Sequence, residues 1–373
     1  MSMSKHNKAF KFRFLPNKNQ EVLLAKTFGC VRFVYNKMLA ERKKTYEKYK
    51  DDKKMLKKQN FPTPAKYKDD FIFLKEVDSL ALANAQINLQ SAYKNFFEGR
   101  AEFPKFKSRK NKQSYTTNLV NGNIELRDGH IKLPKLKFLK IKQHRKVPAD
   151  YRIKSCTISK TKTGKYYISI LTEYEKEIES VKVQKVVGLD FAMGGLYVES
   201  EQGEKANYPH FYRQSLDKLA KEQRVLSHRK KGSARWEKQR LKVARLQEKT
   251  ANQRNNFLHH KSKELSSNYD AVIIEDLDMK SMSKSLHFGK SVHDNGWGMF
   301  TAFLGYKLKE QGKQLVKIDK WFPSTKKCSC CGAVKQLTLS ERIYQCSCSY
   351  VADRDYNSAI NIKNEGLRLL ALS

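Results

Sequence analysis

Five of the seven cysteines lie between Cys328 and Cys348, and their spacing could bind a metal. Cys328-x-x-Cys331 is followed, after fourteen residues, by Cys346-x-Cys348. Paired cysteines on two tight turns supply the four thiolates that tetrahedral Zn²⁺ requires. In a reducing compartment such a cluster indicates a metal rather than disulfides. We therefore predict a zinc ribbon with the ligands Cys328, Cys331, Cys346 and Cys348, whose zinc is structural because so small a module does not fold unaided.

Two features leave the choice of zinc ligands open. The second pair has one spacer residue instead of two, and Cys330 offers a competing thiolate. Gly332 after the first pair suits a knuckle turn and favours the set given above. The alternative is a reactive or regulatory cysteine patch. Leu337–Tyr344 is expected to form the β-hairpin of the ribbon, and the isolated Cys30 and Cys156 are expected to be buried thiols.

Three carboxylates far apart in the sequence could form a second metal site. Asp190 and Glu275 each end a short apolar strand, and Asp355 precedes the final helix. Strand ends are where α/β proteins assemble their sites. Three converging carboxylates would hold two divalent cations about 3.5–4 Å apart, one activating a water molecule and the other stabilising the leaving 3′-oxygen. Oxygen ligands favour Mg²⁺ or Mn²⁺ over zinc.

Each carboxylate also has a simpler interpretation. An aspartate at a strand end is often a turn or cap residue, and Asp355 could cap the last helix. Asp276 and Asp278 compete with Glu275. Strand alternation sends Glu275 and Asp276 to opposite faces, so only one of the two can face a shared site. That three such residues meet is a prediction that the pattern by itself does not test.

The charge balance predicts a polyanionic partner. The chain has 75 Lys and Arg against 38 Asp and Glu, a net charge of +37. An excess of this size, spread through almost every segment, is typical of proteins that bind nucleic acid along an extended groove. Such binding weakens steeply with salt. The alternative is a scaffold with solvated lysines.

Composition also indicates the class of protein. Hydrophobic residues make up 39% of the chain and aromatic residues 11%, so it folds. No apolar run is long enough to cross a bilayer, and Met1–Phe14 does not resemble a secretory signal. We therefore expect an intracellular protein.

The first half is expected to be a set of short strands interrupted by helices. Phe10, Phe12 and Phe14 alternate with cations as in a half-buried strand. A helix is predicted from Asn17 or Asn19 to about Lys50, a loop over Asp51–Lys68, and a second helix over Asp78–Glu98. The strands that follow suggest a small barrel or curled sheet; they are predicted over Ser114–Val120, Ile124–Leu126, His130–Leu133, Lys137–Lys142, Lys154–Ser159 and Tyr166–Tyr174.

The second half is expected to be α/β. Strands are predicted over Val186–Asp190, Ala271–Glu275 and Gln314–Asp319, and helices over Asn295–Gln311 and Ser358–Lys363. Between Phe211 and Leu265, two long helices broken at Lys231-Gly232-Ser233 should pack as an antiparallel hairpin. Their exposed cations are expected to contact a nucleic-acid backbone: Arg229, Lys230, Lys231, Arg235, Arg240 and Arg245.

The order of the motifs resembles one known family over nearly the whole chain. The motifs are Phe12-Arg13-Phe14-Leu15-Pro16, Phe103-Pro104-Lys105-Phe106-Lys107, Gly188-Leu189-Asp190, Ile274-Glu275-Asp276-Leu277, the cysteine ribbon and Asp353-Arg354-Asp355-Tyr356-Asn357. The chain is similar to TnpB (OrfB), a family of transposon-encoded RNA-guided DNA endonucleases related to type V CRISPR effectors. Ser349, where that family commonly has glycine, is a departure, as is the Cys-x-Cys knuckle.

The resemblance implies an α/β multidomain fold. It would contain an N-terminal wedge β-barrel with a helical recognition insertion, then an RNase H-like RuvC domain with an inserted zinc ribbon. The implied boundaries are 1–18 and 113–180 for the wedge, 19–112 for the insertion, 181–322 and 351–373 for the nuclease, and 323–350 for the ribbon.

The resemblance also implies an Mg²⁺- or Mn²⁺-dependent endonuclease in the cytoplasm of a prokaryote, associated with the nucleoid when on DNA. A guide RNA from the transposon end would pair with target double-stranded DNA next to a short motif read around Ser79–Ala83 and Thr117–Asn123. Family catalytic positions fall on Asp190, Glu275 and Asp355. The alternatives are a nuclease-inactive RNA-guided repressor, a transposase accessory protein that binds transposon ends, and a plain zinc-ribbon DNA-binding factor.

Overall fold

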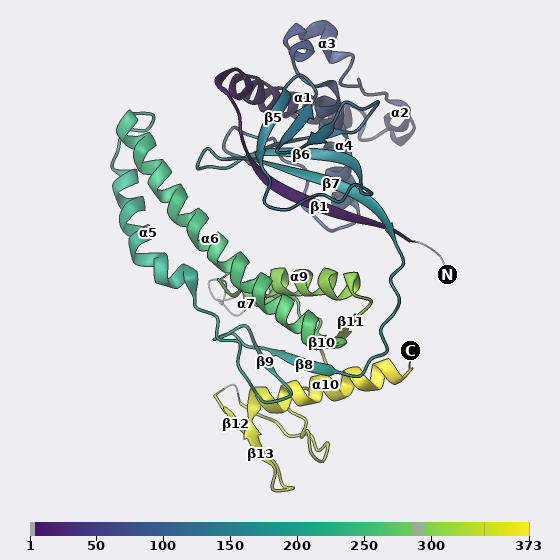
Figure 1. Ribbon diagram of the computed structural model, residues 1–373, viewed down its shortest axis with the longest axis vertical. Coiled ribbons are helices and arrows are strands. Elements are labelled where there is room, and N and C mark those ends of the chain that lie inside the picture. The colour runs from purple at the N-terminus through teal and green to yellow at the C-terminus, as the bar shows by residue number, and fades with distance from the viewer. Residues whose placement is uncertain (1–3, 286–288, 290–293, 339, 373) are drawn as a thin grey trace. The chain divides into compact units, whose positions relative to one another are not determined.

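The computed structural model describes residues 4–285, 289, 294–338 and 340–372. The chain folds into two compact units, Met1–Glu177 and Ile178–Ser373 (Figure 1). The division falls close to the end of the predicted wedge segment, while the finer six-part domain organisation stays a prediction. Within the described residues, no helix combines the length and the apolar character needed to cross a membrane.

Unit 1 is built on a seven-stranded antiparallel sheet in the order β2-β6-β7-β1-β5-β4-β3. The long strand β1 pairs with β7 from Ser4↔Lys176 to Phe14↔Tyr166, and its alternate phenylalanines enter the core. The order leaves β2 and β3 at the two edges, so closure into a barrel stays a prediction. The strands are β1 Ser4–Leu15, β2 Gln113–Asn118, β3 Glu125–Arg127, β4 His130–Leu133, β5 Lys137–Lys142, β6 Arg152–Lys160 and β7 Tyr166–Lys176.

Two helices between β1 and β2 complete the core of unit 1. Helix α1 (Lys18–Tyr49) begins at Asn17, whose side chain accepts a hydrogen bond from the Gln20 backbone in a reciprocal capping box. Helix α4 (Ser79–Phe97) is capped by Asp78 and packs on α1 and β2. Both helices were predicted within two residues of these bounds.

The segment predicted as a loop over Asp51–Lys68 is partly helical. It contains α2 (Lys53–Lys58) and leads into α3 (Tyr67–Asp70), followed by the 3₁₀ turn Ile72–Glu76. The Asp52 side chain accepts hydrogen bonds from two backbone amides of α2 and thereby starts it. The loop prediction was wrong here because the two prolines interrupt only the stretch between the short helices.

Unit 2 is a four-stranded sheet with helices on both faces. The order is β11-β10-β8-β9, with β8, β10 and β11 parallel and β9 antiparallel to β8. Alternate residues of the parallel strands enter two cores, one shared with α6 and α9 and the other with α10. The strands are β8 Val186–Phe191, β9 Tyr197–Glu199, β10 Ala271–Glu275 and β11 Gln314–Ile318, and the helices are α5 Phe211–Ser227, α6 Ala234–Asn268, α7 Met279–Ser285, α9 Trp297–Glu310 and α10 Arg354–Leu372.

Helices α5 and α6 form the predicted antiparallel hairpin, visible as two long rods side by side in Figure 1. Glu222 accepts a hydrogen bond from Gln239, and Ser215 accepts one from Thr250, so residues pair in opposite order along the two helices. The predicted break lies between the helices, where Gly232 has a positive φ of 87° and Ser233 caps α6.

The last helix is longer than predicted. It runs over Arg354–Leu372 instead of Ser358–Lys363, because Asp353 caps it four residues earlier than expected. Its apolar face packs over β8 and β10.

Two glycines allow α10 to lie against the sheet. A Cβ on Gly188 of β8 would lie 2.3 Å from the Ala359 carbonyl oxygen, and one on Gly366 of α10 would lie 2.2 Å from Ile273 Cδ1. Real Cβ atoms do not approach other atoms so closely, so any larger residue would push helix and sheet apart.

Gly188→Ala is therefore expected to destabilise unit 2 by about 1–3 kcal/mol through overpacking. All three tryptophans lie in unit 2, so tryptophan fluorescence during urea unfolding reports on it. Gly298→Ala, where an added Cβ meets nothing within 4 Å, is the control and should lose no stability. Equal unfolding midpoints for the two variants would contradict the tight contact.

Candidate active site and metal centre

Two of the three predicted carboxylates lie near the C-terminal ends of neighbouring parallel strands. Strand β10 pairs with β8 in the register Ile274↔Leu189. Glu275 and Asp190 are the next residues of these two strands, so they lie side by side at the same end of the sheet. Asp190 is only 7% exposed, and Glu275 is partly buried. Burial raises the pKa of both carboxyl groups, because it penalises their charged forms.

The third carboxylate acts on the first from helix α10. The pKa of Asp190 is raised by its burial first, then by the negative charges of Glu275 and Asp355. Ser358, one turn along from Asp355, donates a hydrogen bond to Asp190 with an Oγ–Oδ1 distance of 3.2 Å. Glu275 and Asp355 therefore lie near enough to Asp190 for their charges to act on it, and their sharing of metal ions stays a prediction.

The capping role on α10 belongs to a different aspartate. Asp353 Oδ1 accepts hydrogen bonds from the backbone N–H groups of Asp355 and Tyr356, at 2.9 and 3.2 Å. The Asp355 carboxylate instead pairs with the adjacent Arg354 guanidinium, with an Nη2–Oδ1 distance of 3.2 Å. The alternative of Asp355 as a helix cap is thus wrong.

The rival acidic residues point elsewhere. Asp276 is exposed and pairs with Lys317 at 2.7 Å, as strand alternation requires if Glu275 faces inward. Asp278 accepts hydrogen bonds from the backbone and hydroxyl of Ser281 at the start of α7. Both line a shallow acidic hollow together with Asp319.

Hydrogen bonds that the sequence did not reveal fix Glu275 and the loop beside it. Ser324 donates to Glu275, and the Asn361 side chain of α10 donates to the Ser324 backbone carbonyl at 2.8 Å. Asn361 also donates to the Lys327 carbonyl. Ser324 had no sequence signal of its own, because its role depends on a chain reversal after β11.

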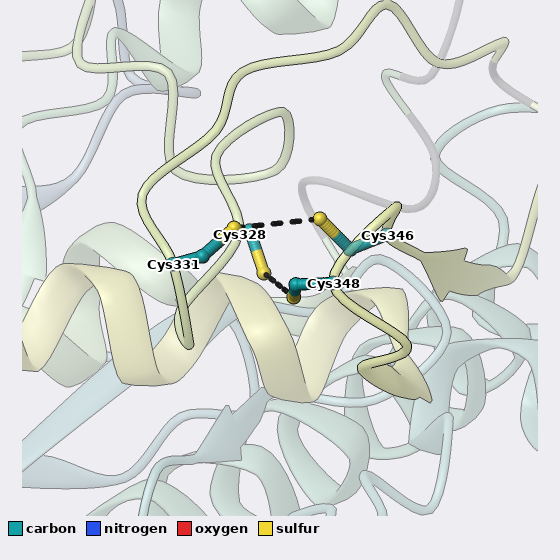
Figure 2. Close-up of side chains that lie close together, drawn as sticks. All are labelled: Cys328, Cys331, Cys346 and Cys348. Carbon is teal, nitrogen blue, oxygen red and sulfur yellow. Dashed lines mark hydrogen bonds between the residues drawn. The ribbon is translucent and has the colours of Figure 1, made fainter.

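Four cysteines converge as predicted from their spacing (Figure 2). The Sγ atoms of Cys328 and Cys348 lie 3.8 Å apart, those of Cys331 and Cys346 lie 3.5 Å apart, and all four lie within 4.8 Å of one another. Among the described residues, these four cysteines are the one group of three or more potential metal ligands whose ligand atoms lie this close together. Cys330 is exposed and lies outside the group.

The surroundings of the cysteines favour the thiolate at Cys346, whereas they raise the pKa values of Cys331 and Cys348. The backbone N–H of Cys348, and next the neighbouring thiols, lower the pKa of Cys346 to about 6. Four thiolates at such spacing fit the tetrahedral coordination of Zn²⁺. A four-cysteine metal centre, with zinc as the ion that suits it, is therefore supported by the donor set itself.

Each cysteine pair lies on its own turn. Lys327 and Val334 bridge across the first turn, and strands β12 (Ile343–Gln345) and β13 (Val351–Asp353) pair across the second. The prediction that Leu337–Tyr344 forms the hairpin was thus wrong, because the hairpin closes around Cys346–Cys348 instead. Ser349 in that turn has a positive φ of 68°, which explains why glycine suits its position.

Family models match three segments of the chain. Residues 3–51 match a "Helix-turn-helix domain", 169–286 match OrfB_IS605, "Probable transposase", and 297–362 match "Cas12f1-like, TNB domain". The second match includes Asp190 and Glu275, and the third includes Asp355 and the four cysteines. Residues 4–51 fold as strand β1 and the single helix α1. This segment therefore does not form the helix-turn-helix after which the first family model is named.

Relatives cover almost the whole chain. A "Putative RNA-guided DNA endonuclease" of Streptomyces pristinaespiralis is 35% identical over 98% of this chain and 90% of the relative. InsQ of Escherichia coli (strain K12), with the same description, is 32% identical over 98% of this chain and 94% of the relative. The chain belongs to the TnpB (OrfB) family.

A solved structure shows the same fold. The Cas12f1 chain of a complex with sgRNA and target DNA aligns over 96% of this chain and 99% of its own length, with a TM-score of 0.62 and 13% sequence identity. This member of the TnpB family therefore has a Cas12f1-like α/β fold with an N-terminal sheet and helices.

In this TnpB family member, Cys346→Ser is expected to abolish zinc binding, because a tetrahedral site with three thiolates loses most of its affinity. The zinc content of the purified chain should fall from about one per chain to near zero. Cys330→Ser is the matched control and should keep its zinc. Loss of zinc from the control would show that the ligand set is wrong.

Proposed function

We propose that this chain is an RNA-guided DNA endonuclease that hydrolyses phosphodiester bonds at a RuvC-like, metal-dependent site. Two relatives above 30% identity, each covered over at least 90% of its length, are named for that activity. The net charge of +37 suits a chain that holds both an RNA and a DNA duplex.

Asp190, Glu275 and Asp355 would hold the catalytic ions. The observation that carries this assignment is geometric: Asp190 and Glu275 follow the paired residues Leu189 and Ile274, and Ser358, one turn after Asp355, donates a hydrogen bond to Asp190. Negative charge contributed by three neighbouring elements is stabilised by cations. Carboxylate oxygens are hard ligands, which favours Mg²⁺ or Mn²⁺.

When bound, such ions supply an activated water molecule and stabilise the leaving oxygen. The water oxygen bonds to phosphorus as the P–O3′ bond breaks, which leaves a 5′-phosphate and a 3′-hydroxyl. The water proton passes to solvent, and the leaving oxygen takes a proton from solvent. Ser358 and Ser324 orient two of the ligands, since each donates a hydrogen bond to one carboxylate.

The proposed division of labour assigns sequence reading to the RNA. Base pairing between guide and target supplies specificity, so the protein needs cations for phosphates and few groups for the adjacent motif. Unit 1 would then be the wedge with its recognition helices, and unit 2 the RuvC-like nuclease with its ribbon. The two segments predicted to read the adjacent motif are Ser79–Ala83, at the start of α4, and Thr117–Asn123, which begins at the end of β2. Helix α4 and strand β2 pack on each other.

The cations predicted to contact a nucleic-acid backbone belong to the α5–α6 hairpin. Arg229, Lys230 and Lys231 follow α5 directly, and Arg235 lies in the first turn of α6. A nuclease-inactive binding protein would lack one of the acidic ligands, whereas all three are present. The nuclease therefore accounts for more of the chain than the binding protein does.

We expect RNA to co-purify with the chain, and Asp190→Ala to abolish cleavage of a target matched to that RNA in the presence of Mg²⁺, with RNA content unchanged. Loss of one ligand removes transition-state stabilisation that the other two do not replace, about 10²-fold or more. Gel analysis of labelled target DNA measures the product.

Asp276→Asn is the control, since it removes a neighbouring carboxylate that faces solvent. It should cleave at the wild-type rate. Persistent cleavage by the Asp190 variant, or loss only in the Asp276 variant, would reject the assignment of the three ligands.

A further inference from the structure

Unit 1 contains a cavity of about 680 Å³ that neither the nuclease site nor the cysteine centre uses. It opens between the C-terminal half of α1, helix α2 and the end of α4. Its volume falls in the range of pockets that bind small ring systems. Its walls are mainly aromatic: Phe61, Tyr93, Phe96, Phe97 and Phe103.

Two cations of α1 lie against these rings. The Arg42 guanidinium is 5.2 Å from the ring centres of both Phe61 and Tyr93, and Lys43 Nζ is 5.1 Å from that of Phe103. Flat rings interleaved with cations are how proteins hold unpaired nucleobases, because every base has a π-face and a nearby phosphate.

One polar group of the cavity wall is left unsatisfied by the described residues. Arg42 Nε is covered and has no hydrogen-bond partner among them. The acidic residue of the wall, Glu47, faces Lys50 at 3.7 Å. A buried donor without an acceptor costs stability, so Arg42 would gain by turning toward an acceptor in the cavity, such as a base edge or a phosphate oxygen.

One wall remains open to solvent. The Phe97 side chain is 77% exposed although it lies in stacking contact with Tyr93, at 6.2 Å between ring centres. A large exposed aromatic face beside a cationic rim indicates a binding surface.

We propose that this cavity binds an unpaired base of the RNA partner by stacking. RNA is recognised mainly through unstacked bases of loops and ends, and the rim cations would contact the flanking phosphates. The inference rests on the proposed RNA partnership, but it is tested by binding rather than by cleavage.

The test uses the full chain, freed of nucleic acid at high salt, and ten-nucleotide single-stranded oligoadenylate RNA with a central 2-aminopurine. Phe97→Ala and Phe103→Ala should each weaken binding about tenfold, with the same salt dependence as the wild type, because stacking and not phosphate contact is lost. The wild type should quench the 2-aminopurine fluorescence, and the two variants should quench it less.

The matched control is Phe138→Ala. Phe138 is 40% exposed with Arg127 at 5.0 Å, while Phe103 is 39% exposed with Lys43 at 5.1 Å, so the two sites differ mainly in the cavity. The control should bind like the wild type.

Five results would overturn the inference. Equal binding by all variants, equal losses in the control, or the same effect with the corresponding DNA oligonucleotide would each do so. If the wild type is a dimer and only the Phe97→Ala variant has a monomeric mass, the exposed aromatic surface binds a second copy of this chain instead of RNA. If the wild type does not bind the RNA at all, the proposed function fails with it; if it binds and cleaves but the variants are unaffected, only this inference fails.

Discussion

The contact of helix α10 with strands β8 and β10 is the constraint on which the candidate site depends. Gly188 and Gly366 allow the helix to approach the sheet closely, so that the first turn of α10 reaches the strand end that carries Asp190. Asp353 takes the capping role and leaves the Asp355 carboxylate to its place beside Arg354. Helix position, more than strand order, thus decides whether three distant carboxylates act on one another.

The same helix connects the acidic site to the cysteine centre. Asn357 donates to the Lys327 carbonyl at 2.8 Å and accepts from the Ser329 amide at 3.0 Å, within the turn that begins at Cys328. Asn361 holds the Ser324 backbone, and Ser324 in turn holds Glu275. A metal that orders the cysteine turns would therefore also stiffen the loop that positions Glu275.

Much of this arrangement could be predicted from sequence because its signals are local. Apolar strands that end in Asp190 and Glu275, the Asn17 cap and the cysteine spacing each depend on residues close together. The start of α10, the hairpin around Cys346 and Cys348 and the role of Ser324 could not be predicted, since each is decided by contacts between distant segments. The family resemblance ordered the motifs, but only the fold shows which side chains act on Asp190.

The central claim is that the carboxylates at positions 190, 275 and 355 share divalent ions. Anomalous diffraction at the manganese edge, from crystals of the RNA- and target-bound chain grown with Mn²⁺, tests it most directly. The account predicts two manganese peaks bounded by Asp190, Glu275 and Asp355. Peaks bounded instead by Asp276, Asp278 and Asp319, or none near Asp190, would contradict it.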